Sequence, residues 1–325
     1  MFEKVNAGHP DKMADRLAGA VVDLVYERAG GLTKANPRVA CEVMAGHGKA
    51  TVMIESSEDF REVEIEPIVR RLAGDVTLDL HAVRQDALLA GNQEGAVRCG
   101  DNGIFRGCAP TYEQKVLTAM AASIYERWPY DGKYIIGRYR HKGNIVPSED
   151  DDRSLALTVC QSHANEDEIL DWWHKFGNEH LWDLQVNKTF CFGRTKDDKK
   201  RYISLTKVNP LGPWTGGIDV DCGATNRKLG SDMGEGVTGG GLHGKDLSKG
   251  DVSINIACFL KAVQSGQTVT ACCSIGDEQV TFVYAGGKTE TETFRDVVEM
   301  ARLYILTVGG FEKFSEWGLI RPKDL

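Results

Sequence analysis

The chain has 325 residues and a formal net charge of −8, with 42% hydrophobic and 26% charged residues. This length allows a large core and two or three domains. The acidic balance argues against a general nucleic-acid or membrane-surface binder, which would need a basic excess. The apolar stretches fall short of the roughly 20 residues that span a bilayer, and the N-terminus has no apolar signal region. We therefore expect a cytoplasmic protein, with no nucleic-acid or membrane partner and with reduced cysteines, because its nine cysteines form no CxxC pair.

The hydrophobic pattern predicts three similar helix–strand–strand–helix units. The first has helices at 10–28 and 62–72 around strands at 38–44 and 50–55. The second has helices at 112–128 and 166–176 around strands at 133–139 and 154–160, and the third has helices at 251–263 and 293–306 around strands at 268–274 and 279–284. We expect an α+β fold with three similar sheet-and-helix lobes, at residues 1–96, 97–213 and 214–325. An α+β chain without internal duplication is the alternative.

Three long segments between these units, 90–110, 182–213 and 216–250, show no clear helix or strand pattern. The last is rich in glycine and carries four cations, Arg227, Lys228, Lys245 and Lys249. Glycine lets the backbone come close to a ligand and expose its N–H groups, and Arg and Lys bind phosphate oxygens. The segment therefore predicts a phosphate-chain site, with a flexible glycine linker as the alternative.

Residues 239–245 also match G-x4-G-K, the start of a nucleotide-binding P-loop. The next residue is Asp246, where that motif needs Ser or Thr, and the preceding segment is rich in glycine rather than strand-like. This disfavours an unrelated P-loop phosphotransferase but leaves the phosphate site in place.

The segment AGHPDK at 7–12 lies at the start of the first predicted helix. With Pro10 at the first helical position, His9 lies at the cap, where unpaired helix N–H groups favour an anion. Asp11 in the first turn could hold a metal ion, and Lys12 could add a cation. Asp is also common in this position simply because it suits the helix dipole.

Three further acidic residues lie in strands or turns. Glu42 and Glu55 fall on the two strands of the first hairpin, and Asp101 falls in the glycine turn GDNG. Strand carboxylates often only face solvent, and Asp is a frequent turn former. The residues alone leave their role open.

The order of these segments resembles one family. GHPDKMAD, RVACE, GDNG, DCGATNRK and GGGLHGKDLSKGD are similar to the signature series of S-adenosylmethionine synthetases, over nearly the whole chain. The resemblance implies three interlocked lobes around a pseudo-threefold axis, in a homodimer or dimer of dimers with shared active sites. It implies a methionine adenosyltransferase, which converts ATP, L-methionine and water to S-adenosylmethionine, phosphate and pyrophosphate by displacement at C5′ of ATP. A catalytically impaired relative that acts as a nucleotide-binding or regulatory partner is the alternative.

The resemblance also implies roles for the candidate residues. The catalytic set would comprise His9, at the oxygen between C5′ and the α-phosphate, and the cations Lys133, Arg227, Lys245 and Lys249. ATP would further contact Asp131, Trp214, Asp221, Lys228 and Ile275, with Trp214 and Ile275 on opposite sides of adenine. Methionine would meet Glu55 and Asp101. Asp11 and Asp251 would hold two Mg²⁺ ions, and Glu42 would bind K⁺.

The chain departs from the family pattern in four places. The loop between Leu80 and Asp101, which covers the active site in the family, is shortened. Asn226 stands where glycine is more usual, the segment GGGLHGKD is one residue short, and Pro213 occupies a position often held by Arg. None of these changes removes a candidate metal ligand or core cation. We expect loop closure, turnover and triphosphate hydrolysis to differ from those of longer relatives.

Overall fold

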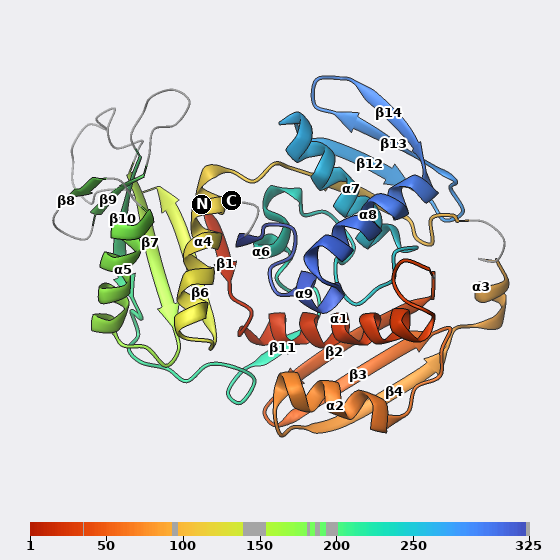
Figure 1. Cartoon of the computed structure of the whole chain (residues 1–325), viewed down its shortest axis with the longest axis horizontal. Helices are drawn as coiled ribbons and strands as arrows, with labels where there is room; N and C mark the ends of the chain where they lie inside the picture. Colours follow the sequence, from red (N-terminus) through yellow and green to blue (C-terminus); the bar gives the residue numbers. More distant parts are fainter. Residues whose placement is uncertain are drawn as a thin grey trace.

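A computed structural model describes residues 1–34, 36–92, 97–138, 154–180, 183–185, 189–192 and 201–322. These residues form an α+β fold with three sheets, each packed against helices. The three lobes surround the short helices α6 (Leu229–Met233) and α9 (Phe311–Ser315), as Figure 1 shows. The predicted fold class is confirmed.

The first lobe holds a four-stranded sheet in the order β11-β2-β3-β4. Strands β2 (Val39–Gly46) and β3 (Lys49–Ser56) form the predicted antiparallel hairpin. Helix α2 (Glu62–Ala73) then leads to β4 (Thr77–Arg84), which runs parallel to β3. Alternate residues of β2 are buried against α1 (Pro10–Arg28), whose apolar residues recur at helical spacing.

The second lobe holds a six-stranded sheet in the order β1-β6-β7-β10-β9-β8. Its strands are β1 (Phe2–Val5), β6 (Gly132–Arg138), β7 (Ser154–Gln161), β8 (Asp183–Gln185), β9 (Thr189–Phe192) and β10 (Arg201–Val208). Helices α4 (Tyr112–Arg127) and α5 (Glu166–His180) belong to this lobe. The buried aromatic residues of α5, Trp172, Trp173 and Phe176, help to form a hydrophobic core separate from the main one.

The third lobe holds a four-stranded sheet in the order β14-β13-β12-β5. Its strands are β5 (Gly103–Gly107), β12 (Val269–Cys273), β13 (Gln279–Tyr284) and β14 (Thr289–Thr293). Helices α7 (Gly250–Ser265) and α8 (Phe294–Val308) pack against it. The remaining elements are α3 (Ala87–Asn92) and a 3-10 turn at Gly234–Gly236.

Each sheet takes a strand from a distant part of the chain. Strand β1 pairs with β6 of the second lobe, β5 pairs with β12 of the third, and β11 (Cys222–Ala224) pairs with β2 of the first. Figure 1 shows β11 beside β2, although about 180 residues separate them in the sequence. The division into lobes at 1–96, 97–213 and 214–325 stays a proposal. Through these three strands, each lobe contains residues from outside its proposed range.

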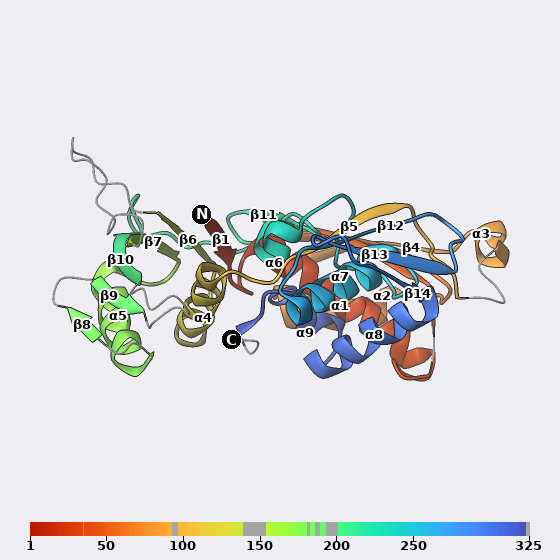
Figure 2. The ribbon, with the colours of Figure 1, turned by 90° about the horizontal axis from the view of Figure 1, so that it is seen from above.

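In the first and third lobes the long helices lie on one side of the sheets, below the strands in Figure 2. On the other side, alternate strand residues are exposed, and several are large and apolar: Met44, Met53, Ile104 and Val283. Within the described ranges, no helix is both long enough and apolar enough to cross a membrane.

All the predicted helices and hairpin strands are confirmed to within a few residues, apart from residue 139 at the end of one strand, which lies outside the described residues. The prediction of irregular structure was wrong in part. The segment 90–110 contains β5, 182–213 contains β10, and 216–250 contains β11 and α6. These elements are short or rest on neighbours far away in sequence, so the local pattern did not reveal them.

Candidate active site

Helix α1 begins at Pro10, as predicted, and His9 is its N-cap residue. The His9 Nδ1 atom accepts the Asp11 backbone N–H at 3.1 Å, so the ring carries its hydrogen on Nε2. His9 is 3% exposed, and burial together with Lys133 and Lys228 lowers its pKa to about 2. His9 is therefore a neutral N–H donor at the N-terminus of a helix.

Asp11 in the first turn of α1 is buried and surrounded by hydrogen-bond donors. Its Oδ1 accepts the Ala224 backbone N–H at 2.9 Å. Arg227 Nη1 lies 3.5 Å from Oδ1, and Lys228 Nζ lies 3.3 Å from Oδ2. Gly223 makes this approach possible, because a Cβ there would lie 2.0 Å from the Pro10 carbonyl oxygen. The structure thus brings both cations to the helix end.

Residues of the second lobe extend this site. The Lys133 ammonium lies 3.7 Å from Asp221 Oδ2 and 5.5 Å from the centre of the Trp214 ring. Asp131 Oδ2 accepts the Gly217 N–H at 3.1 Å, but its buried Oδ1 has no partner among the described residues. Burial raises the pKa of Asp131 to about 6.

Eight of the candidate residues therefore belong to one cluster around the N-terminus of α1. We call it the cap group: His9, Asp11, Asp131, Lys133, Trp214, Asp221, Arg227 and Lys228.

A second cluster forms at the N-terminus of α7. Lys245 Nζ donates to Asp251 Oδ2 at 2.6 Å, and Asp251 lies in the first turn of the helix. Lys249 is the N-cap residue, and in the described structure its side chain makes no capping hydrogen bond. The backbone of Lys245 forms a β-bridge with Ala40, whose partner across the hairpin is Glu55.

Asp101 and Ile275 lie beside this second cluster. The Gly100 N–H donates to the Ser248 carbonyl at 3.0 Å, which places the Asp101 turn next to Lys249. The Ile275 N–H donates to Asn102 Oδ1 at 2.8 Å, and the Ile275 side chain is 65% exposed. We call this set the loop group: Glu55, Asp101, Lys245, Lys249, Asp251 and Ile275.

The two candidate residues for adenine, Trp214 and Ile275, fall in different groups. Trp214 lies between β10 and β11, whereas Ile275 lies between β12 and β13. Strand β10 belongs to the six-stranded sheet, and β12 and β13 belong to the sheet that contains β5 and β14 (Figure 1). Glu42 lies on the exposed face of β2, where its carboxylate accepts a hydrogen bond from the Thr225 hydroxyl. The roles of these residues stay predictions.

The expectation that Lys12 adds a cation to the phosphate site is wrong, because its side chain is buried in a separate cluster. Its ammonium lies 3.0 Å from Asp15, 2.7 Å from Asp232 and 3.4 Å from His243. Burial alone would lower the pKa of Lys12, but the two carboxylates raise it above its ordinary value. Sequence reasoning missed this cluster, although the i, i+3 spacing of Lys12 and Asp15 was a signal.

Asp15, Asp232 and His243 present ligand atoms within 4.8 Å of one another, an arrangement that could hold a metal ion. The Lys12 ammonium already lies among these atoms and supplies the positive charge. A metal ion there would have to displace a buried, paired ammonium, so this cluster fits a structural role better.

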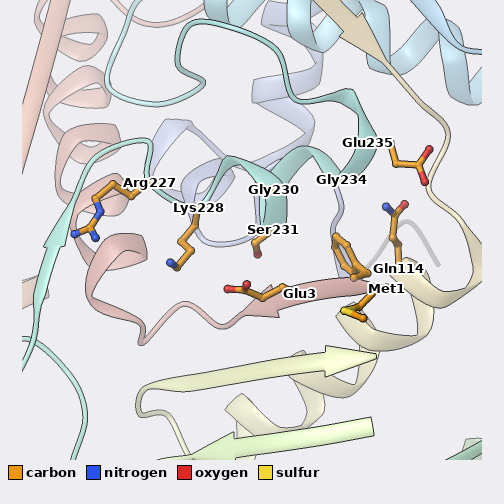
Figure 3. Close-up of a pocket in the computed structure, with 10 residues that line it drawn as sticks. Met1, Glu3, Gln114, Arg227, Lys228, Gly230, Ser231, Gly234 and Glu235 are labelled. Atoms are coloured by element: carbon orange, nitrogen blue, oxygen red, sulfur yellow. The ribbon is translucent and has the colours of Figure 1, made fainter. Parts of the chain in front are cut away.

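A pocket of about 370 Å³ adjoins the cap group. Arg227 and Lys228 line one end of it, and Gln114 and Glu235 line the other (Figure 3). Glu3 on β1 lies along its floor in this view. The pocket gives the two cations access to solvent.

Comparisons with known proteins place these features in context. Residues 1–89 match the family model of the S-adenosylmethionine synthetase N-terminal domain. An S-adenosylmethionine synthase from Parvibaculum lavamentivorans is 32% identical over 289 residues, which cover 77% of this chain and 68% of that protein. One from Mycoplasma capricolum is 26% identical and covers 99% of this chain and 87% of the relative.

A solved structure of an unusual S-adenosylmethionine synthetase from Campylobacter jejuni is similar in fold. The TM-score is 0.65 at 16% sequence identity, and the match covers 100% of this chain and 96% of the other. At this identity the likeness speaks for the fold alone.

Proposed function

The chain belongs to the S-adenosylmethionine synthase family, and from this premise we propose that it joins L-methionine to ATP. The triphosphate that leaves is then hydrolysed by water, so the products are S-adenosylmethionine, phosphate and pyrophosphate. The observation that carries this proposal is the cap group, in which a buried helix N-terminus, a neutral histidine and three cations converge.

The residue types of the cap group suit this chemistry. The methionine sulfur is a neutral nucleophile, so attack on C5′ needs no general base. Negative charge grows on the departing triphosphate and must be stabilised. His9 offers its Nε2–H to the leaving oxygen, while Lys133, Arg227 and Lys228 bind the phosphates. Because His9 is neutral, it donates a hydrogen bond without transferring its proton.

The nucleoside would contact the second-lobe side of the cap group. Asp131 Oδ1 is buried and finds no partner in the described part of the chain, so it is suited to accept a hydrogen bond from a ligand hydroxyl. The Trp214 ring is half-buried and offers a face for adenine, a contact worth about 1–3 kcal/mol. Asp221, which faces Lys133, would help to orient that lysine.

The loop group would supply the remaining contacts. Lys245 and Lys249 would bind the triphosphate, and Ile275 would close the free side of adenine. Glu55 and Asp101 would face the methionine ammonium, because carboxylates are its natural partners.

The carboxylates also fit the metal ions that we propose. Asp11 and Asp251 are oxygen donors next to phosphate-binding cations, and Mg²⁺ is typically held by one or two carboxylates and substrate phosphates. Two Mg²⁺ ions held there would neutralise phosphate charge. Glu42, next to the Thr225 hydroxyl, would hold K⁺.

We further propose that each active site combines the cap group of one chain with the loop group of a second copy, in a homodimer or dimer of dimers. The helix-free faces of the first and third sheets support this. They expose Met44, Met53 and Ile104, an apolar surface that a second copy would cover. Ile275 and Glu55 lie exposed as well, so a partner chain could complete the contacts around them.

One assay tests the proposed activity. Purified protein is mixed with ATP, Mg²⁺ and K⁺, with and without methionine, and S-adenosylmethionine, pyrophosphate and phosphate are measured. We expect all three products to depend on methionine. Absence of S-adenosylmethionine at micromolar enzyme would overturn the proposal and favour a nucleotide-binding relative without activity. Phosphoryl transfer without methionine would indicate an unrelated phosphotransferase.

A further inference from the structure

Asn226 directly precedes Arg227 and Lys228, and its side chain binds the segment that leads to Lys245. It adopts a φ of 63°, in the left-handed region that asparagine tolerates better than most residues. Its backbone N–H donates to the buried Asp15 Oδ1 at 2.8 Å. Arg227 and Lys228 follow directly in the sequence, so this hydrogen bond fixes the backbone position from which their side chains extend.

The Asn226 carboxamide binds the glycine-rich loop that leads to Lys245. Its Oδ1 accepts the Leu242 N–H at 2.8 Å and the His243 N–H at 2.9 Å. Its Nδ2 donates to the His243 carbonyl at 3.3 Å. Gly241 packs against the carboxamide so closely that a Cβ there would lie 2.8 Å from Asn226 Cγ. One side chain thus forms three hydrogen bonds to the loop.

His243, which bonds to the Asn226 carboxamide, is also held by contacts of its own ring. The His243 ring lies 2.9 Å from Asp232 Oδ2 and 3.0 Å from the Ser315 hydroxyl, and all three residues are buried. Asp232 in turn pairs with Lys12, which also pairs with Asp15. The segment of Arg227 and Lys228 and the segment of Lys245 therefore both contact the same buried cluster. The Asn226 carboxamide connects the two segments directly.

We propose that Asn226 is a positioning residue that fixes the segment carrying Arg227 and Lys228 against the segment carrying Lys245. The proposal rests on the proposed function, in which Arg227 and Lys228 bind the triphosphate of one active site and Lys245 of the same chain binds that of the neighbouring site. Without the carboxamide, the glycine-rich loop loses the acceptor of two backbone N–H groups, and Lys245 is no longer held in its binding position. Preorganised cations bind an anion more tightly because less motion is lost on binding.

The test variant is Asn226→Gly, because glycine adopts a φ of 63° without strain and only the carboxamide is lost. The matched control is His47→Gly, at another residue with positive φ (51°), in the exposed β2–β3 turn. Binding of inorganic triphosphate with Mg²⁺ and binding of adenosine are measured by calorimetry. We expect Asn226→Gly to weaken triphosphate binding about tenfold, the net value of one or two hydrogen bonds, and to leave adenosine binding unchanged.

Hydrogen exchange in the free protein provides a second measurement. The Leu242 and His243 amides should exchange slowly in the original chain and in His47→Gly, and faster in Asn226→Gly. Unchanged triphosphate binding in Asn226→Gly would overturn the inference, as would an equal loss for both ligands with a lowered melting temperature. If the original chain protects these amides but binds no triphosphate, the proposed function fails while the contact itself stands.

Discussion

The N-termini of α1 and α7 carry the same residue types but differ in how many contacts the rest of the chain makes with them. Each has an Asp in its first turn and a cation close to that carboxylate. At α1, His9 caps the helix, and the second lobe adds Asp131 and Lys133. At α7, the N-cap residue is Lys249, whose side chain makes no capping bond in the described structure, and Ile275 nearby is exposed.

The difference shows that two helix N-termini with similar sequences can have different structural surroundings. The α1 end is organised by contacts within the chain, including the buried Lys12 cluster behind it. At the α7 end, Asp251 is buried and paired with Lys245, whereas Ile275 nearby is exposed, as expected where the protein meets a ligand or a second copy.

The largest effect should come from the support behind α1. Lys12→Met leaves Asp15 and Asp232 buried without their ammonium partner, and should lower the free energy of unfolding by about 3–5 kcal/mol. The control Lys49→Met breaks an exposed pair with Asp79 and should cost no more than about 1 kcal/mol. Urea denaturation compares the two. Equal losses of unfolding free energy in the two variants would mean that the buried cluster does not stabilise the N-terminus of α1.

His9→Ala should lower kcat about 100- to 1000-fold, because one preorganised donor to the leaving oxygen is lost. His47→Gly, at an exposed turn with positive φ, serves as the control and should keep the original rate. Initial rates of S-adenosylmethionine formation decide this. A loss of less than about threefold in His9→Ala would remove His9 from the catalytic set.

Asp251→Asn tests the α7 end. Loss of a residue that supports a metal ligand costs about 10- to 100-fold in metal affinity, and loss of a ligand itself should cost no less. The Mg²⁺ concentration for half-maximal rate should rise accordingly. Asp296→Asn changes the matching first-turn acid of α8, which is exposed and outside both groups. An unchanged Mg²⁺ requirement in Asp251→Asn would refute the metal role.

The smallest effect concerns pH. Because burial raises the pKa of Asp131 to about 6, its carboxylate is ionised above that pH and becomes protonated below it. A protonated carboxyl is the poorer acceptor, so kcat/KM for ATP should fall as pH drops through about 6, approaching tenfold per unit. Asp131→Asn should lose this acidic limb. A limb that persists in the variant would assign it to another group.

Helices and hairpins could be predicted from the sequence because their patterns are local. Leu17 and Val21 repeat at helical spacing, and Val39, Cys41 and Val43 alternate on β2. Strand β14 reads TETET and has no apolar side chain, so only its pairing with β13 defines it. Strand β11 has three residues and depends on β2, a partner distant in sequence.

The candidate site was predicted unevenly for the same reason. Motifs that lie within a few residues, such as His9 to Asp11, were visible in the sequence. The buried cluster of Lys12, Asp232 and His243 was not, because 220 residues separate Lys12 from Asp232. Asn226 was noticed only as a departure from the family pattern, and its three bonds to the glycine-rich loop required the fold.

Mixed dimers test whether the cap group and the loop group of one chain serve different active sites. Inactive His9→Ala and Asp251→Asn chains are unfolded together and refolded in equal amounts, and S-adenosylmethionine formation is measured. If the sites are shared, half of the dimers are mixed and each mixed dimer has one intact site, so activity should return to about a quarter of that of the original chain. If both groups of one chain serve the same site, every site keeps one defect. Activity that stays at the sum of the activities of the two variants would contradict shared active sites.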